Sequence, residues 1–154
     1  MHPKYSIPEI ERRWLVSAEL AATLEGRAFR MIEDLYIDGT QLRLRKISAP
    51  AAEPAYKLCK KYGREAPLAN PITNIYLTKS EHENLSALSG KRASKRRYDL
   101  ADGVIDVYDG APTLAIFEVE FRSEDEAARY APPPFVREEV TGDARYSGFA
   151  LARL

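Results

Sequence analysis

Two carboxylates and a guanidinium alternate along one short segment near the N-terminus: Glu9, Glu11 and Arg13. The segment 7–16 is predicted to be a strand, on which successive side chains point to opposite faces. The three charged side chains then share one face, where burial is costly unless partners balance them. A divalent cation is one such partner, because hard cations take oxygen ligands. A solvent-facing strand with cross-strand ion pairs explains the same spacing, and this stretch alone favours that simpler interpretation.

The same spacing of charges recurs on later predicted strands. An open sheet could carry such pairs on a wet face, whereas a closed antiparallel barrel could point them all into its lumen. A lumen lined by acids and bases is stable only when water, ions and ligand fill it. A polyanion with a divalent metal ion is the expected occupant, since Arg and Lys bind phosphate oxygens and carboxylates bind Mg²⁺ or Mn²⁺. The recurring pairs are Arg43 and Arg45, Lys95 and Arg97, and Glu118 and Glu120.

Hydrophobic alternation and turn residues predict about eight strands, joined by hairpins or short helices, which implies antiparallel pairing. Asp-Gly pairs at 38–39 and 109–110 mark two of the turns. Ser80, with Glu83 three residues later, is expected to cap a helix over 78–89. The other expected helices are 17–26 and 123–130. The predicted strands after the first are 28–37, 40–47, 56–62, 72–77, 91–98, 103–108 and 113–121, with a short final strand near 148–152.

The totals restrict the class of protein. A chain of 154 residues with 45% apolar and 30% charged residues suits one domain with an ample core. Its formal net charge is zero, so any polyanion site must be a local concentration of charge, and neither nucleic acid nor a membrane is an expected partner. The single cysteine, Cys59, suits a reducing compartment, and the N-terminus lacks a signal-peptide pattern. A cytoplasmic protein is therefore expected. No Gly-rich phosphate loop is present, which excludes a P-loop enzyme.

Over nearly its whole length the chain resembles the CYTH superfamily, also called the triphosphate tunnel metalloenzymes. The ExExK motif of that family's first strand corresponds here to Glu9-Ile10-Glu11-Arg12-Arg13. One ExEx match is weak, but an ordered set of matches is specific. The further matches, in chain order, are Leu42–Arg45, Lys60, Lys95–Tyr98, Ile105–Gly110, Phe117–Phe121 and Glu139–Tyr146.

The resemblance implies a mainly β (α+β) fold: a closed eight-stranded antiparallel β-barrel that forms a tunnel, with a few short flanking helices, in a single CYTH-like domain over 1–154. It also implies a phosphohydrolase that acts on phosphoanhydride bonds with Mg²⁺ or Mn²⁺, with inorganic triphosphate as the expected small-molecule substrate. The alternatives left open are an adenylate cyclase, a thiamine triphosphatase, and a non-catalytic or weakly active phosphate- or polyphosphate-binding barrel. Whether the chain forms a homodimer is also left open.

The same resemblance implies roles for individual residues, in three groups. The acidic and basic residues of the first motif would be catalytic: Glu9, Glu11 and Arg13. The carboxylates of the first and last motif strands would bind metal: Glu9, Glu11, Glu118 and Glu120. Basic residues would bind the substrate phosphates, with three further residues in support. The phosphate-binding residues are Arg43, Arg45, Lys60, Lys95 and Arg97, and the supporting ones are Asp106, Asp143 and Arg145.

Three positions depart from the family pattern. Arg13 replaces the motif lysine; it keeps the charge but cannot donate a proton at ordinary pH. Asn74 stands where many members carry a strand glutamate, and Val104 stands where an acidic residue often precedes Asp106 by two. Fewer carboxylates in the lumen imply weaker binding of a second metal ion, and hence a slow enzyme or a pure binder.

Overall fold

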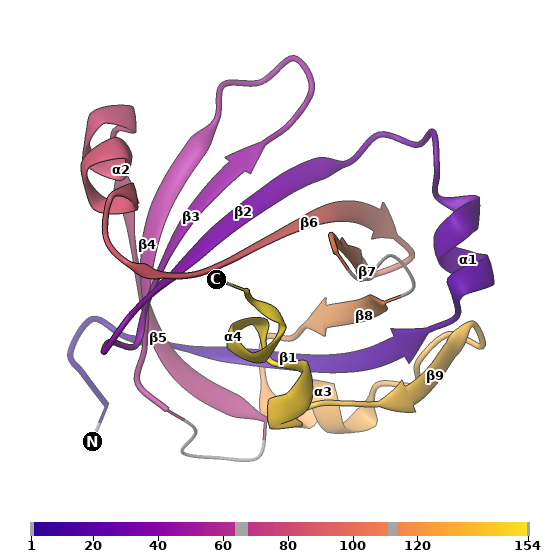
Figure 1. The fold of residues 1–154 in the computed structure, drawn as a ribbon. Helices are drawn as coiled ribbons and strands as arrows, with labels where there is room; N and C mark the ends of the chain where they lie inside the picture. The colour runs from indigo at the N-terminus through magenta and orange to yellow at the C-terminus, as the bar shows by residue number, and fades with distance from the viewer. Residues whose placement is uncertain (1, 64–67, 111–113, 154) are drawn as a thin grey trace.

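One antiparallel sheet dominates the molecule. The computed structural model describes residues 2–63, 68–110 and 114–153, and nine strands in these residues are ordered β5-β4-β3-β2-β6-β7-β8-β1-β9. β5 also pairs with β1, which closes eight of the strands into a ring and leaves β9 outside it (Figure 1). The predicted closed eight-stranded antiparallel barrel is thereby confirmed.

Short helices and turns connect and cover these strands. The strands are β1 (Ile7–Val16), β2 (Arg30–Ile37), β3 (Leu42–Ser48), β4 (Ala55–Lys61), β5 (Ala69–Leu77), β6 (Gly90–Leu100), β7 (Gly103–Tyr108), β8 (Ala115–Glu120) and β9 (Val136–Glu139). The helices are α1 (Ala18–Thr23), α2 (Lys79–Ser86), α3 (Glu124–Arg129), the 3₁₀ turn η1 (Ala144–Tyr146) and α4 (Gly148–Leu151). Thr113, the expected first residue of the strand 113–121, lies outside the described residues. Among the helices described, none is long and apolar enough to cross a membrane.

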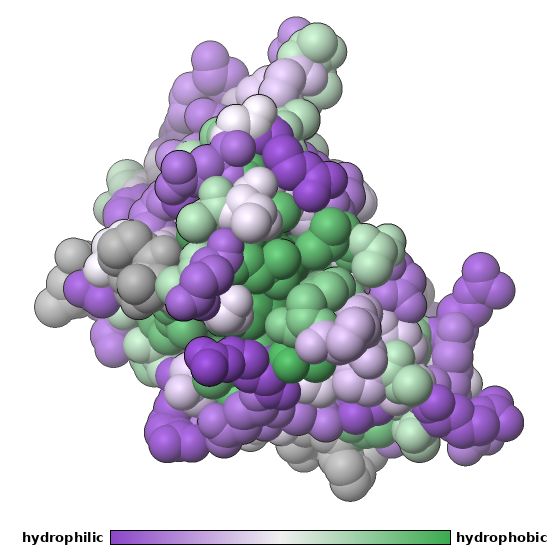
Figure 2. All heavy atoms as spheres, turned by 90° about the vertical axis from the view of Figure 1, so that its right-hand side faces the viewer, coloured by the Kyte–Doolittle hydropathy of each residue, from purple (hydrophilic) through white to green (hydrophobic). Residues whose placement is uncertain are grey.

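The hydrophobic core lies on the outer side of the barrel wall. Trp14 and Phe117 are cross-strand partners on β1 and β8, with ring centroids 6.0 Å apart, and they pack with Leu24 beside α1. Figure 2 views the molecule from the side where α1 lies in Figure 1, and apolar residues gather there within a hydrophilic border. A second cluster contains Leu35 and Leu44 and packs against α2. Because side chains alternate along a strand, this outward apolar set turns the charged set inward.

The Asp-Gly turn predicted at 38–39 joins β2 to β3 as expected, and Gly39 adopts a φ of +69° that favours glycine. Three local expectations were wrong. The cap of α2 is Thr78 with Glu81, two residues before the predicted pair, because their side chains and backbone N–H groups bond reciprocally at 3.1 and 2.8 Å.

The predicted final strand near 148–152 was also wrong. This segment is the short helix α4, because the Ser147 hydroxyl accepts a hydrogen bond from the Ala150 N–H and starts a helical turn. Strand pairing near the C-terminus is limited to a single bridge between Arg153 and Arg92 among the residues described. β9 was not predicted; it pairs with the last residues of β1.

The cap of α2 yields a stability prediction. Thr78→Ala removes the hydroxyl that accepts the Glu81 N–H, so we expect the free energy of unfolding to fall by about 1 kcal/mol. Ser80→Ala, at the position first predicted as the cap, should change it by less than about 0.5 kcal/mol. Urea unfolding of both variants measures the difference. Equal losses in the two variants would contradict the capping assignment.

Candidate active site

The barrel encloses a cavity of about 470 Å³. Side chains from all eight strands of the ring line it, together with residues from 142–148 near the C-terminus. The lining is dominated by charge rather than by apolar surface. Its charged residues are Glu9, Glu11, Arg13, Arg43, Arg45, Lys57, Lys61, Lys95, Arg97, Glu118, Glu120 and Asp143.

The structure brings most of the residues predicted from the sequence into this one space. The β1 triplet stands next to the β8 pair, since Glu11 is the register partner of Glu120 and Arg13 that of Glu118. The predicted basic pairs of β3 and β6 reach the cavity from the other strands of the ring. Asp143 lines the cavity from the C-terminal segment, whereas its partner Arg145 is exposed and bonds it at 2.7 Å.

Lys60 is the predicted phosphate-binding residue that the structure does not bring to the cavity. Its ammonium group lies 5.8 Å from the centroid of the Tyr62 ring, on the outward face of β4. Lys57 and Lys61 line the cavity instead, because they share the inward face with Cys59. The sequence held a signal for this register: Leu58 is apolar and shares the face of Lys60, and apolar residues of this barrel face outward.

Asp106 contacts two basic residues of the cavity wall. Its carboxylate lies 2.6 Å from the Lys95 ammonium and accepts two bonds from Arg97 at 2.7 and 2.8 Å. Burial alone would raise the pKa of Asp106, but Lys95 and Arg97 outweigh it and hold the pKa well below its ordinary value. The aspartate therefore stays ionised and fixes both cations in the cavity wall.

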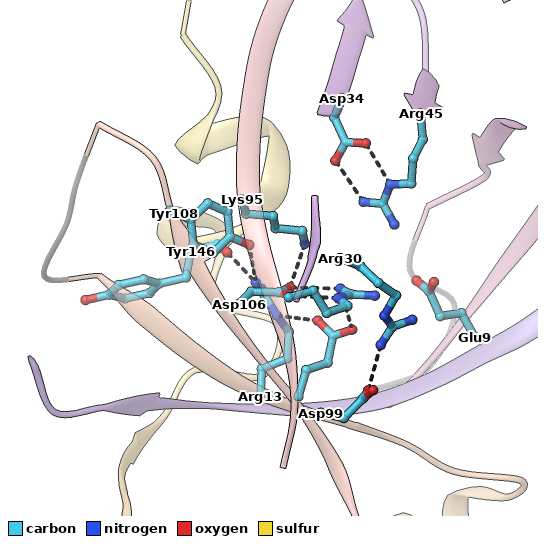
Figure 3. A network of polar contacts seen from close by, with 12 residues as sticks. Glu9, Arg13, Arg30, Asp34, Arg45, Lys95, Asp99, Asp106, Tyr108 and Tyr146 are labelled. Atoms are coloured by element: carbon cyan, nitrogen blue, oxygen red, sulfur yellow. Dashed lines mark hydrogen bonds and ion pairs between the residues drawn. The ribbon is translucent and has the colours of Figure 1, made fainter. Parts of the chain in front are cut away.

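Asp34 is a functional candidate that the sequence interpretation missed. It is the register partner of Arg45 across the β2–β3 hairpin, and its carboxylate accepts two bonds from that guanidinium at 2.7 and 2.8 Å (Figure 3). Both side chains are buried. The Asp-Gly turn at 38–39 sets this register, so the hairpin signal could have placed Asp34 opposite Arg45.

Arg13, which replaces the motif lysine, is held by several partners. Its Nε lies 3.3 Å from a Glu118 oxygen, and its Nη1 donates to the backbone carbonyl of Tyr146 at 2.7 Å. A longer bond of 3.4 Å joins Nη2 to the Tyr108 hydroxyl, and Figure 3 shows this group of side chains together. Arg13 thus links β1 and β8 to the C-terminal segment.

Arg43 has no comparable partner. Its side chain is only 9% exposed, its Nε is buried without a hydrogen bond, and no acidic residue in the described ranges forms an ion pair with it. Lys61, by contrast, binds Glu9 at 2.9 Å. A buried guanidinium without an anion is costly, so Arg43 is prepared for an anionic ligand.

The carboxylates of Glu11 and Glu120 lack a positively charged partner, since neither forms an ion pair with a residue that the structure describes. Burial raises the pKa of Glu11 to about 8, and the nearby Glu118 and Glu9 carboxylates add to the shift. Glu120 is more exposed to solvent, and its pKa is raised by partial burial and by the same two neighbours. A bound cation would remove this penalty, because it balances the negative charge that burial disfavours.

The donor set is compatible with Mg²⁺ or Mn²⁺ on these grounds. Over 2–63, 68–110 and 114–153, no three acidic, histidine or cysteine side chains are already gathered around a common point that could hold an ion. Mg²⁺ does not require such a cage, since it is usually held by one or two carboxylates, water and substrate phosphates. The fit therefore rests on the oxygen donors of Glu11 and Glu120 and their lack of counter-charge.

The buried Asp34–Arg45 pair yields a second prediction. Asp34→Asn leaves the Arg45 guanidinium buried without its counter-charge, so we expect a loss of about 3–5 kcal/mol in the free energy of unfolding. Asp99→Asn breaks the exposed pair with Arg30 and should cost less than about 1 kcal/mol. Chemical denaturation compares the two variants, and a loss at Asp34 no larger than that at Asp99 would contradict the assignment.

The same pair predicts a pH dependence. Bonds from Arg45 outweigh burial and lower the pKa of Asp34 in the folded protein. Its stabilisation is therefore complete above the unfolded-state pKa of about 4 and is lost as the pH falls through the lower folded value. We expect the stability gap between wild type and Asp34→Asn to narrow from pH 7 to pH 3 in unfolding measurements. A gap that stays constant over this range would contradict the proposed ionisation of Asp34.

Comparison with known proteins agrees with this geometry. No protein-family model matches the sequence. A curated relative, an inorganic triphosphatase of Nitrosomonas europaea (strain ATCC 19718), is 36% identical over 152 residues, which cover 94% of this chain and 96% of the relative. The crystal structure of the inorganic triphosphatase NE1496 is 30% identical, covers 99% of this chain and 97% of that one, and superposes with a TM-score of 0.53.

These matches extend over almost the full length of both chains, and the barrel is the fold that the ordered motifs implied. The chain therefore belongs to the CYTH family of triphosphate tunnel enzymes, together with the inorganic triphosphatase of Nitrosomonas europaea.

Proposed function

We propose that this chain hydrolyses inorganic triphosphate in the barrel cavity and that the reaction depends on Mg²⁺ or Mn²⁺. One observation carries the proposal: unmatched charges of opposite sign line the same cavity. Arg43 stands on β3, four strands round the ring from β8, which carries Glu120. A triphosphate with a divalent cation would neutralise both walls at once. The curated relative with 36% identity is itself an inorganic triphosphatase, which supports the choice of substrate.

In this proposal the basic side chains of the cavity contact the phosphates, and the acidic side chains bind the cation. Arg43 has a buried Nε–H donor without a partner for a phosphate oxygen, and Arg97, fixed by Asp106, neutralises charge that develops on the leaving phosphates. Glu11 and Glu120 would hold the cation. When bound, the cation would supply further charge neutralisation and a more acidic water molecule. The barrel wall keeps these groups in place before the substrate arrives, so little reorganisation is needed.

A barrel that binds triphosphate without turning it over is the second candidate. The observation that favours it is the arrangement of Arg13. An arginine cannot act as a proton donor at ordinary pH, and this one already forms an ion pair with Glu118 and donates a hydrogen bond to the Tyr146 carbonyl. If the motif position must supply a proton, this chain would bind the substrate and react slowly.

Phosphate release from inorganic triphosphate, ATP and pyrophosphate, each with Mg²⁺ or Mn²⁺ and with EDTA, tests the proposal. We expect release from triphosphate that needs the metal ion. Metal-dependent binding without release would support the second candidate instead. Formation of cyclic AMP from ATP would identify an adenylate cyclase.

The carboxylate assignment gives a sharper prediction. Glu120→Gln keeps the size of the side chain but weakens its hold on a cation, so we expect metal-dependent turnover to fall by at least about 10-fold, with the fold preserved. Glu138→Gln, an exposed glutamate on β9, serves as the control and should keep the wild-type rate. Steady-state kinetics over a range of Mg²⁺ concentrations measures both. A wild-type rate in Glu120→Gln would remove this residue from the metal site.

A further inference from the structure

Of the basic side chains that line the cavity, most are already matched with an acid. Arg13 pairs with Glu118 and Arg45 with Asp34, as described above. Lys61 pairs with Glu9, while Lys95 and Arg97 share Asp106. Only Arg43 and Lys57 lack an acidic partner among the residues that the structure describes. The positive charge that is left for an anionic ligand is therefore concentrated at Arg43 and Lys57 rather than spread over the whole cavity.

Arg43 and Lys57 belong to one patch of the wall. They stand on the neighbouring strands β3 and β4, where Lys57 is the register partner of Arg45 and Arg43 that of Cys59. Burial is the main cause that lowers the pKa of Lys57, and the nearby Arg45 and Arg43 guanidiniums add positive charge that lowers it further. An anion bound here would balance that positive charge.

Asn74 adds an unused polar group beside this patch. It is the register partner of Cys59 on β5, so Arg43, Cys59 and Asn74 form one row across three strands. Its side-chain oxygen is buried without a hydrogen bond, and it lines the same cavity. A ligand that fills the patch would need an anionic group for the cations and a water or hydroxyl donor for this oxygen.

Arg43, at one side of the patch, lies across the barrel from Glu120, because β3 is opposite β8 in the ring of eight strands. Lys57 on β4 is three strands from β8 and two from β1, which carries Glu11, so it stands between Arg43 and the carboxylates. A chain of phosphates that begins at the carboxylate wall would direct its far end toward β3 and β4.

We propose that Lys57, together with Arg43, binds the far terminal phosphate of inorganic triphosphate and makes the site selective for an unsubstituted phosphate end. This inference rests on the proposed function. In ATP the corresponding phosphate carries an ester to the nucleoside, so it has one fewer ionisable oxygen and a bulky substituent. Lys57 is a specificity-determining residue that the family motifs do not contain.

The expected loss of affinity in a Lys57 variant follows from the lost hydrogen bond between the lysine ammonium and a phosphate oxygen. A hydrogen bond between charged groups contributes enough for its removal to weaken binding by about 10- to 100-fold. Lys57 forms no ion pair with an acid of the described residues, and Glu120, on which it acts at a distance, is partly exposed, so its replacement leaves no fully buried anion unmatched. We therefore expect Lys57→Gln to fold as wild type does, in contrast to variants of the matched cations.

Binding of inorganic triphosphate and of ATP to Lys57→Gln, Lys57→Arg, Lys60→Gln and wild type tests the proposal. Lys60 is the matched control, because it is a lysine of the same strand on the outward face. The measured quantity is the ratio of the two affinities, obtained from ligand-induced shifts of the unfolding temperature with Mg²⁺ present, and phosphate release is followed in the same samples so that only intact ligand is counted. We expect this ratio to fall by about 10-fold or more in Lys57→Gln, to be largely retained in Lys57→Arg, and to be unchanged in Lys60→Gln.

The proposal would be overturned if the wild type binds neither ligand or does not prefer triphosphate over ATP. It would also be overturned if Lys57→Gln keeps the wild-type affinity ratio, or if Lys60→Gln lowers that ratio as much as Lys57→Gln does. Phosphate release distinguishes this inference from the proposed function. A preference that depends on Lys57 without turnover would leave the inference standing and reject hydrolysis. Turnover with an unchanged ratio in Lys57→Gln would do the reverse.

Discussion

The cost of burying charge governs this structure. A closed barrel of eight strands has an inner face shielded from bulk water, and here that face carries acids and bases from every side. Each unmatched buried charge is expensive, so the fold is possible only because most of them are paired across neighbouring strands. The apolar residues that usually fill a small barrel lie on its outer surface instead, beneath short helices and β9.

Pairing also prepares the cavity for its ligand. Asp34 holds Arg45 in a fixed position, and Asp106 holds Lys95 and Arg97. Loss of either aspartate would therefore lower the stability of the fold. While both are present, these basic side chains need not rearrange when a ligand binds. Among the described residues, the charges without an ion-pair partner are of both signs, with Arg43 on β3 opposite Glu120 on β8. Such an arrangement favours a ligand that is itself anionic and arrives with a cation.

Two of the departures from the family pattern, Asn74 and Val104, put neutral side chains where the resemblance implies acids, whereas Arg13 keeps the charge of the motif lysine. Asn74 brings an amide where many members carry a carboxylate. Val104 faces the same side of the wall as its partner Glu118 without adding an acid. Arg13 bonds the C-terminal segment through the Tyr146 carbonyl, so it holds the edge of the cavity together as well as lining it. The cavity therefore carries fewer carboxylates than the resemblance implies.

Much of the fold could be predicted from the sequence alone, because alternation and turn residues act locally. The charge spacing in Glu9-Ile10-Glu11-Arg12-Arg13, the Asp-Gly turns and the ordered motifs were enough for strands, hairpins and the family. Where the sequence was ambiguous, as in two adjacent lysines at 60 and 61, one residue of register decided which side chain faced inward, and packing of Leu58 on the outer core decided the register.

The partners of each charge depended on the tertiary structure. That Asp34 holds Arg45, that Arg13 reaches Tyr146, and that Arg43 and Lys57 remain unmatched all depend on strands brought together by closure of the ring. The sequence determined which residues carry charge and how they alternate. Only the closed barrel decided which charges neutralise one another and which are left for a ligand, because that depends on distances between strands remote in the chain.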